Sequence, residues 1–149
     1  MHKRDNAFVN MQKCTDDLMK ELTQTSHIDE YLKNNDKYII TENLSSFICD
    51  RIAEKGISKA QVLRNADINE IYGYQILSGK RLPSRQKLIS ICIGAEFNLE
   101  LTNEVIKLAG YAPLSPKNKW DSIVIFGIAN HLSITKINET LYDHQLETL

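Results

Sequence analysis

The sequence predicts an all-α protein, and three observations predict it. Only three prolines and six glycines occur in 149 residues, which leaves long stretches that a helix can occupy without interruption. Apolar residues recur at helical spacing along most of the chain. Ser or Asn stands before several of these stretches, in the position of a helix N-cap. Because 42% of the residues are hydrophobic and 25% charged, we expect a globular protein with a sizeable core.

Several other classes of protein are excluded by composition. The longest apolar run, 123–129, has seven residues, whereas a membrane helix needs ~20. Lys3 and Arg4 precede Asp5 and no apolar segment follows, so we expect no secretory signal. The cysteines are far apart and form no CxxC pair, which argues against a disulfide scaffold or zinc site. They are Cys14, Cys49 and Cys92. We therefore expect a cytoplasmic protein.

Residues 1–40 predict an N-terminal helical arm. The segment 1–24 has one apolar stripe at helical spacing. Its members are Phe8, Met11, Leu18 and Leu22. A shorter helical turn is expected at 27–32, and 38–40 form a short apolar bridge. Thr41 or Asn43 then caps a helix that runs to Lys55, with an apolar face before Gly56 in the position of a left-handed C-cap. This face comprises Leu44, Phe47, Ile48, Ile52 and Ala53.

Two short helices follow in close succession. Ser58 and Gln61 fit a capping box, with Ser at the N-cap and Gln at N3, and open a helix that reaches about Ala66. Asn69 is a second N-cap, and it opens a helix over 70–77. Two helices of about eight residues joined by a turn of about three have the proportions of a helix-turn-helix motif.

One ungapped stretch of 27 residues carries a family resemblance, and it reads ISKAQVLRNADINEIYGYQILSGKRLP over 57–83. This stretch resembles the helix-turn-helix core of the XRE family, the phage-repressor-like DNA-binding proteins. It opens on Ile57-Ser58-Lys59, against the family's apolar-Thr-Gln, and closes on Gly-Lys-x-x-Pro at 79–83. With helices at 43–55, 84–96 and 99–109, the resemblance implies a five-helix DNA-binding domain over 41–110. The sequence after residue 110 is similar to that of a Firmicutes-type subgroup of these regulators, which has a C-terminal helical extension.

Three positions depart from the family pattern. Leu63 stands where the family usually has a small Ala, and Gly73 where it usually has a branched apolar residue. In the family these two positions face each other, so we interpret the exchange as one change that conserves volume. Asp67 takes the place of the turn glycine, and Asp tolerates a left-handed backbone better than most residues.

A repeat is predicted in the C-terminal half. With an offset of 35 residues, 84–114 aligns with 119–149, and the apolar pattern agrees across the unit. The alternative is chance agreement between two amphipathic helix pairs. Each unit is interpreted as a helical hairpin, and the second belongs to a C-terminal segment over 111–149. We predict that this hairpin and the arm stabilise a homodimer, with Trp120 and Phe126 as anchors; packing within the chain is the alternative.

The basic residues concentrate in one segment. Residues 51–88 hold eight bases and three acids, a balance of +5, which leaves −6 for the rest of the chain. Such an island is a possible footprint for a polyanion, and a solvated face is the alternative. The predicted phosphate contacts are Ser58, Lys59, Lys80, Arg81 and Arg85. Such contacts position a protein on DNA without reading sequence.

The second helix of the motif carries the predicted base contacts, because its N-terminal part meets base edges in this fold. These residues are Asn69, Glu70, Ile71, Tyr74 and Gln75. Gln75 can pair with adenine, Glu70 can accept from cytosine, and Ile71 can touch a thymine methyl group. We expect Tyr72 to pack inside the domain instead. No Arg or Lys lies within 70–77, so a function other than DNA binding remains an alternative.

The sequence thus predicts a sequence-specific regulator that binds double-stranded DNA, as a homodimer and without cofactor or metal. It shows no catalytic constellation, since its four histidines are scattered and no HExxH, GxSxG or phosphate-binding loop occurs. The alternative is a protein-binding module on the same scaffold, such as an antitoxin, an adaptor or an inhibitor of another machine. A protein partner could bind through the C-terminal hairpin.

Overall fold

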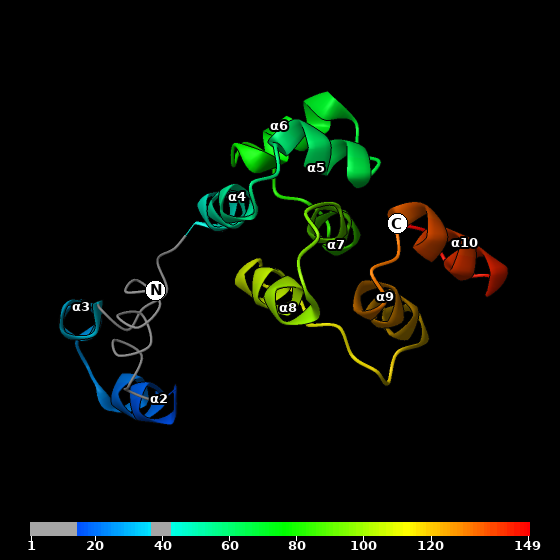
Figure 1. Ribbon diagram of the computed structural model, residues 1–149. Coiled ribbons are helices and arrows are strands. Elements are labelled where there is room, and N and C mark those ends of the chain that lie inside the picture. The colour runs from blue at the N-terminus through cyan, green and yellow to red at the C-terminus, as the bar shows by residue number, and fades with distance from the viewer. Residues whose placement is uncertain (1–14, 37–42) are drawn as a thin grey trace. The chain divides into compact units, whose positions relative to one another are not determined.

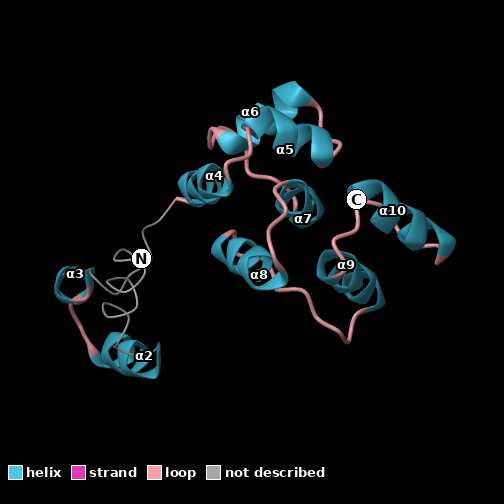
Figure 2. Ribbon diagram, in the orientation of Figure 1, coloured by secondary structure: helices cyan, strands magenta, loops and turns pink. Residues whose placement is uncertain are grey.

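The computed structural model describes residues 15–36 and 43–149, within two compact units, Met1–Glu42 and Asn43–Leu149. All regular structure in the described residues is helical, and no strand occurs among them (Figures 1 and 2). The predicted all-α class is therefore confirmed for this part of the chain. None of its helices combines the length and the apolar character that crossing a bilayer requires.

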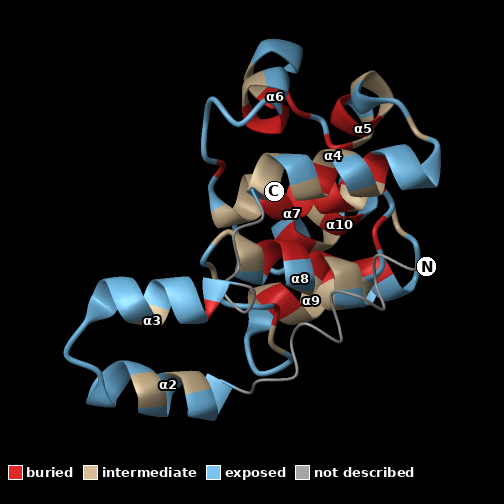
Figure 3. Cartoon of the chain, turned by 90° about the vertical axis from the view of Figure 1, so that its left-hand side faces the viewer, coloured by how far each residue is buried: buried red, intermediate tan, exposed pale blue. Residues whose placement is uncertain are grey.

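The first unit contains α2 (Thr15–Gln24) and α3 (Ile28–Asn34). No residue of either helix is buried (Figure 3). Asn35 is buried, and its side-chain amide donates to the Glu21 carboxylate at 2.8 Å. The helices expected over 1–24 and 27–32 are confirmed as far as residues 15–36 extend. Phe8, Met11 and the bridge 38–40 lie outside the described residues.

The second unit begins with α4 (Leu44–Lys55), which Asn43 caps by accepting a hydrogen bond from the Ser45 amide. Gly56 ends the helix with φ +72°, the left-handed geometry expected there. Ile48 and Ile52 are buried as predicted. Ala53 is exposed, which corrects its placement on the same face. Successive helical residues are about 100° apart around the axis, so Ala53 cannot share the direction of Ile52.

The next two helices are α5 (Lys59–Asn65) and α6 (Glu70–Leu77). Both predicted N-caps are confirmed, because the Ser58 hydroxyl accepts from the Gln61 amide at 3.1 Å and the Asn69 side chain accepts from the Tyr72 amide at 3.2 Å. Only half of the capping box forms. The Gln61 side chain donates to Asn65 instead of returning to Ser58.

The turn and the crossing between α5 and α6 also follow the sequence. Asp67 takes φ +54°, so it adopts the left-handed backbone that a glycine usually supplies. Leu63 faces Gly73, since a Cβ atom on Gly73 would lie 2.7 Å from Leu63 Cδ1. The large residue on one helix therefore occupies the space that the small residue on the other leaves open, and the predicted pair is confirmed.

Two further helices complete the first hydrophobic core. They are α7 (Arg85–Gly94), capped by Ser84, and α8 (Leu99–Leu108), capped by Asn98. Helix α7 packs on α5 and α8 packs on α4. Gly94 permits a close approach to α5, because a Cβ atom there would lie 2.8 Å from the Ala66 amide nitrogen. The core includes Ile48, Val62, Leu63, Ile76, Leu88, Ile91 and Val105.

The chain ends in α9 (Lys119–Ala129) and α10 (Ile134–Asp143), which form the predicted second hairpin. A second core joins this hairpin to α7 and α8. Its fully or largely buried members are Ile89, Ile106, Leu114, Val124, Ile128, Ile137 and Leu141. The buried face of the hairpin is therefore covered by helices of the same chain. This agrees with packing within the chain, which was the alternative to a homodimer. The homodimer stays a prediction.

Candidate nucleic-acid interface

Helix α6 separates its residues into a buried and an outward side. Gly73, Ile76 and Leu77 are buried. Glu70, Ile71 and Tyr74 are exposed, and Gln75 is half-buried. Residues three and four apart share one side of a helix, so the predicted base contacts on α6 lie together. The Asn69 side chain precedes them at the N-cap, where its oxygen holds the Tyr72 amide.

The turn after α6 presents two cations. Gly79 adopts φ +82°, and the amides of Lys80 and Arg81 both donate to the Gln75 carbonyl, at 2.9 and 3.1 Å. These bonds hold the turn against the end of α6. The Arg81 guanidinium lies 5.3 Å from the centre of the Tyr72 ring, in cation–π geometry. Tyr72 itself packs against the first core, as expected.

Ser58 and Lys59 are exposed at the start of α5. The Ser58 hydroxyl already accepts the Gln61 amide hydrogen, but a hydroxyl retains its own hydrogen to donate. Four of the five predicted phosphate contacts, namely these two residues with Lys80 and Arg81, thus lie on the surface of the second unit.

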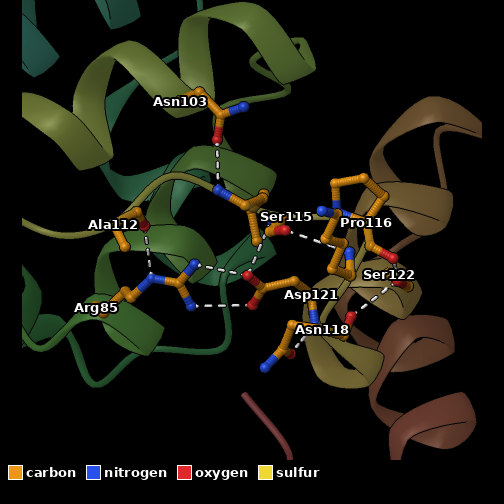
Figure 4. Close-up of polar contacts among 10 residues, drawn as sticks. Arg85, Asn103, Ala112, Ser115, Pro116, Asn118, Asp121 and Ser122 are labelled. Atoms are coloured by element: carbon orange, nitrogen blue, oxygen red, sulfur yellow. Dashed lines mark hydrogen bonds and ion pairs between the residues drawn. The ribbon is translucent and has the colours of Figure 1, made fainter.

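Arg85 differs from the other predicted phosphate contacts. Its Nη1 and Nη2 atoms donate to the two oxygens of the Asp121 carboxylate at 3.1 and 3.0 Å, and Nε donates to the Ala112 carbonyl at 2.9 Å (Figure 4). The Asp121 side chain is only 8% exposed. We therefore remove Arg85 from the proposed interface. Its acidic partner lies 36 residues away in sequence, where a local charge pattern cannot reveal it.

Sequence reasoning missed one exposed residue beside the interface. Leu82 follows Arg81 and is 69% exposed, whereas Pro83 after it is buried. Leu is among the residue types most often buried, so its type alone does not indicate an exposed position. The only signal was its place in the closing motif, at a position that the family pattern leaves variable.

Other kinds of site find less support in the described residues. Among 15–36 and 43–149, no three His, Cys, Asp or Glu side chains gather into a group that can hold a metal ion. Burial raises the pKa of the Cys92 thiol to about 12, so this thiol stays protonated near neutral pH and is a poor nucleophile.

Comparison of this chain with protein-family models, with curated proteins and with solved structures finds no match. The resemblance to the XRE family therefore rests on the residues of 57–83 themselves. The outward side of α6 and the cations that flank it are the features from which a function can be inferred.

Proposed function

We propose that this chain is a DNA-binding transcriptional regulator of bacterial or mobile-element type, in which α4–α8 form an XRE-like helix-turn-helix domain and α6 enters the major groove. The observation that carries the proposal is the outward side of α6, which presents Ile71, Tyr74 and Gln75, together with the turn that follows it. The amides of Lys80 and Arg81 donate to the Gln75 carbonyl and hold both exposed cations at the end of α6. The major groove is about 12 Å wide and admits one helix with its side chains.

The residue types on α6 favour a specific kind of site. Ile71 is 73% exposed, and its methyl groups suit contact with a thymine methyl group. The Gln75 amide suits the paired donor and acceptor of adenine in the major groove, and Glu70 suits the amino group of cytosine. We therefore expect A·T pairs at the positions that Ile71 and Gln75 contact and a C·G pair at the position that Glu70 contacts.

The flanking residues supply the contacts that do not depend on sequence. Lys59, Lys80 and Arg81 are exposed, and the proposal assigns them to phosphates together with Ser58. Such contacts release counterions, so binding weakens as salt rises. A regulator of this kind needs no cofactor and no chemical step, and it acts in the cytoplasm, where bacterial DNA lies.

A second candidate function is protein binding through the same surface. Ile71 and Leu82 are large apolar residues that are 73% and 69% exposed, and the acidic Glu70 is repelled by phosphate. A protein partner would bury the apolar side chains and tolerate the acid. We rank this function second because Lys80 and Arg81 border the same helix.

The test is selection of bound duplexes from a random DNA pool with the full-length chain, followed by salt titration of the selected duplex. We expect Lys59→Ala, Lys80→Ala and Arg81→Ala each to reduce the slope of log affinity against log salt by about one. Lys136→Ala is the matched control, since this lysine is also exposed but lies on α10. No enriched sequence together with unchanged slopes would favour the protein-binding function.

Gln75→Ala tests base reading directly. We expect it to relax the preference at one base pair by roughly 1–3 kcal/mol, while random DNA is bound as before. The measurement is competition between the selected duplex and its single-base variants. Equal loss of affinity for selected and random DNA would contradict a base contact.

A further inference from the structure

The two hairpins share a backbone design that extends beyond their helices. Helices α8 and α10 begin and end 35 residues apart. Glu96 and His131, also 35 apart, adopt φ +59° and +55° between the helices of each hairpin. Gly110 and Gln145 adopt φ +87° and +60° after the second helix of each. Left-handed residues are a common helix ending and also follow α4, α5 and α6, at Gly56, Asp67 and Gly79. The matched endings therefore agree with the repeat, and the side-chain contacts carry the argument for it.

Side-chain hydrogen bonds repeat with the same offset. Asn103 accepts from the Leu114 amide at 2.9 Å, and Asn138 accepts from the Leu149 amide at 2.7 Å. The Arg85 Nε atom donates to the Ala112 carbonyl, and Trp120 Nε1 donates to the Glu147 carbonyl at 2.8 Å. Two unlike side chains thus make the same bond at matched positions. The predicted repeat is confirmed, and chance agreement between two helix pairs does not explain it.

The hairpins also pack reciprocally. Helix α7 lies beside α10 and α8 lies beside α9, so each helix contacts the counterpart of its own hairpin partner (Figure 1). Matched residues from both hairpins therefore enter the same core. The matched pairs are Ile89 with Val124, Ile106 with Leu141, and Leu114 with Leu149. Two copies of one face in mutual contact form an isologous arrangement, which is the geometry of a twofold dimer.

Contacts near the approximate twofold axis agree with this arrangement. Only residues close to such an axis contact their own counterparts, and the Arg85 guanidinium lies 6.0 Å from the centre of the Trp120 ring. A groove of about 890 Å³ contains further matched residues. They are Ile93 with Ile128, Phe97 with Leu132, and Leu99 with Ile134.

We propose that the C-terminal hairpin occupies the position that the α7–α8 hairpin of a second copy of this chain would take, so that the chain acts as a monomer and presents a single α6 to DNA. The monomer rests on the packing of the hairpins. Its consequence for DNA rests on the proposed function.

Two features favour the chain's own hairpin over a second copy. Residues 109–118 link α8 to α9, and a short linker keeps its end at an effective concentration of about 1 mM, roughly a thousandfold above a micromolar second copy. The contact is also asymmetric, because Arg85 meets Asp121 and Trp120. In a pair of first hairpins, Arg85 would face Arg85 and Gln86 would replace Asp121, so like charges would weaken that pairing and shift it to high concentration.

Figure 4 shows how the linker is held. The Asp121 carboxylate accepts from the Ser115 amide at 3.0 Å in addition to the Arg85 guanidinium, and Asn118 caps α9 by accepting from the Asp121 amide. Ser122 donates to the Pro116 carbonyl at 3.0 Å. These bonds join the linker to both hairpins and favour docking within one chain over exchange between chains.

The first experiment uses the full-length chain. We expect sedimentation velocity to give the monomer mass throughout the micromolar range. We expect duplex selection to enrich an unsymmetrical motif, with one chain per duplex in the sedimenting complex. A dimer mass, or two chains on a palindrome, would overturn the inference in favour of the predicted homodimer. If no duplex is enriched, the proposed function fails. The mass of the free chain still shows whether the protein is a monomer.

A pair of variants of the full-length chain tests the docking face. Val124→Asp with Leu141→Asp places two charges in the second core, whereas Phe126→Asp with Tyr142→Asp places two charges on exposed positions of the same helices. We expect the first variant to expose the α7–α8 face and double its mass at high micromolar concentration. We expect the control to remain a monomer. Ile106→Asp added to the first variant should abolish the doubling.

Circular dichroism shows whether the charged variants keep their helices. One outcome is a first variant that loses no more helical signal than α9 and α10 contribute and still remains a monomer at every concentration. This outcome would show that the face does not accept a second copy, and it would overturn the inference. If that variant loses its helices, the sedimentation of the unmodified chain and its stoichiometry on DNA decide the inference.

Discussion

The hairpins α7–α8 and α9–α10 follow one design but fill their crossings differently. In the first, Cys92 lies beside Thr102. At the matched positions of the second, Gly127 lies against Ile137, and a Cβ atom on Gly127 would clash with the isoleucine side chain. The volume has moved from one helix to the other, as between Leu63 and Gly73 in the α5–α6 crossing. A helix crossing therefore constrains the summed volume of the two facing side chains more than the volume of either one.

The outer faces of the two hairpins differ in how far matched residues are buried. Ile91 is fully buried in the first core, whereas its counterpart Phe126 is 59% exposed. Val105 is also fully buried, and Thr140 replaces it in the second hairpin. The inner faces are apolar in both hairpins because they cover each other. The comparison teaches that the helical pattern defines a face, while the neighbouring element decides whether this face is buried.

The largest expected effect separates the inner face from the outer one. Leu141→Ala should lower the free energy of unfolding by about 2–5 kcal/mol, because Leu141 is fully buried and truncation leaves a cavity. Ile106→Ala, at the matched position, should cost a similar amount. Phe126→Ala should change stability by only about 0.5 kcal/mol, despite the larger side chain. Urea unfolding measures all three, and an equal cost for Phe126→Ala would mean that its face is covered.

The crossings can be tested with double-mutant cycles. Leu63→Ala should cost about 2–5 kcal/mol through a cavity, and Gly73→Ile about 1–3 kcal/mol through overpacking. The double variant restores the volume, so its cost should fall below the sum by roughly 0.5–3 kcal/mol. A cycle on Gly127 and Ile137 should couple in the same sense. Additive costs in denaturant unfolding would show that volume is not what links these residues.

Breaking the ion pair between the hairpins should have a smaller effect. Arg85→Ala leaves the buried Asp121 carboxylate with the hydrogen bond from the Ser115 amide, and should cost about 1.5–3 kcal/mol. Lys136→Ala removes the exposed pair with Glu139, 3.5 Å long, and should change stability by at most about 0.5 kcal/mol. Thermal unfolding distinguishes the two. Similar melting shifts would indicate that Arg85 and Asp121 do not hold the hairpins together.

The smallest expected effect concerns Cys92, which has no thiol counterpart in the second hairpin. Burial raises its pKa from 9.0 to about 12 in the folded chain, so the unfolded chain releases the proton first as pH rises. The contribution is complete below pH 9 and is lost between pH 9 and 12, and about 1 kcal/mol of it is lost by pH 10. Cys92→Ala should show a correspondingly shallower loss of stability from pH 8 to 10. Parallel curves would argue against a buried protonated thiol.

Local chemistry determined much of this fold from sequence alone. Ser58 and Asn69 cap helices because their side-chain oxygens reach amides two or three residues ahead, whatever surrounds them. Gly56 and Asp67 supply left-handed turns for reasons that lie in their own backbone. The 35-residue repeat was visible because a helical hairpin must keep its apolar spacing wherever it packs.

Tertiary structure alone decided which surfaces remain available. Arg85 belongs to the basic segment by sequence, but the fold brings Asp121 to it from 36 residues away. Leu82 and Phe126 are apolar by type, yet no element covers them among the described residues. The second hairpin covers the first because reciprocal packing buries both apolar faces at once. These outcomes depend on contacts between residues that are distant in sequence and come together only on folding. A local sequence pattern does not predict such contacts.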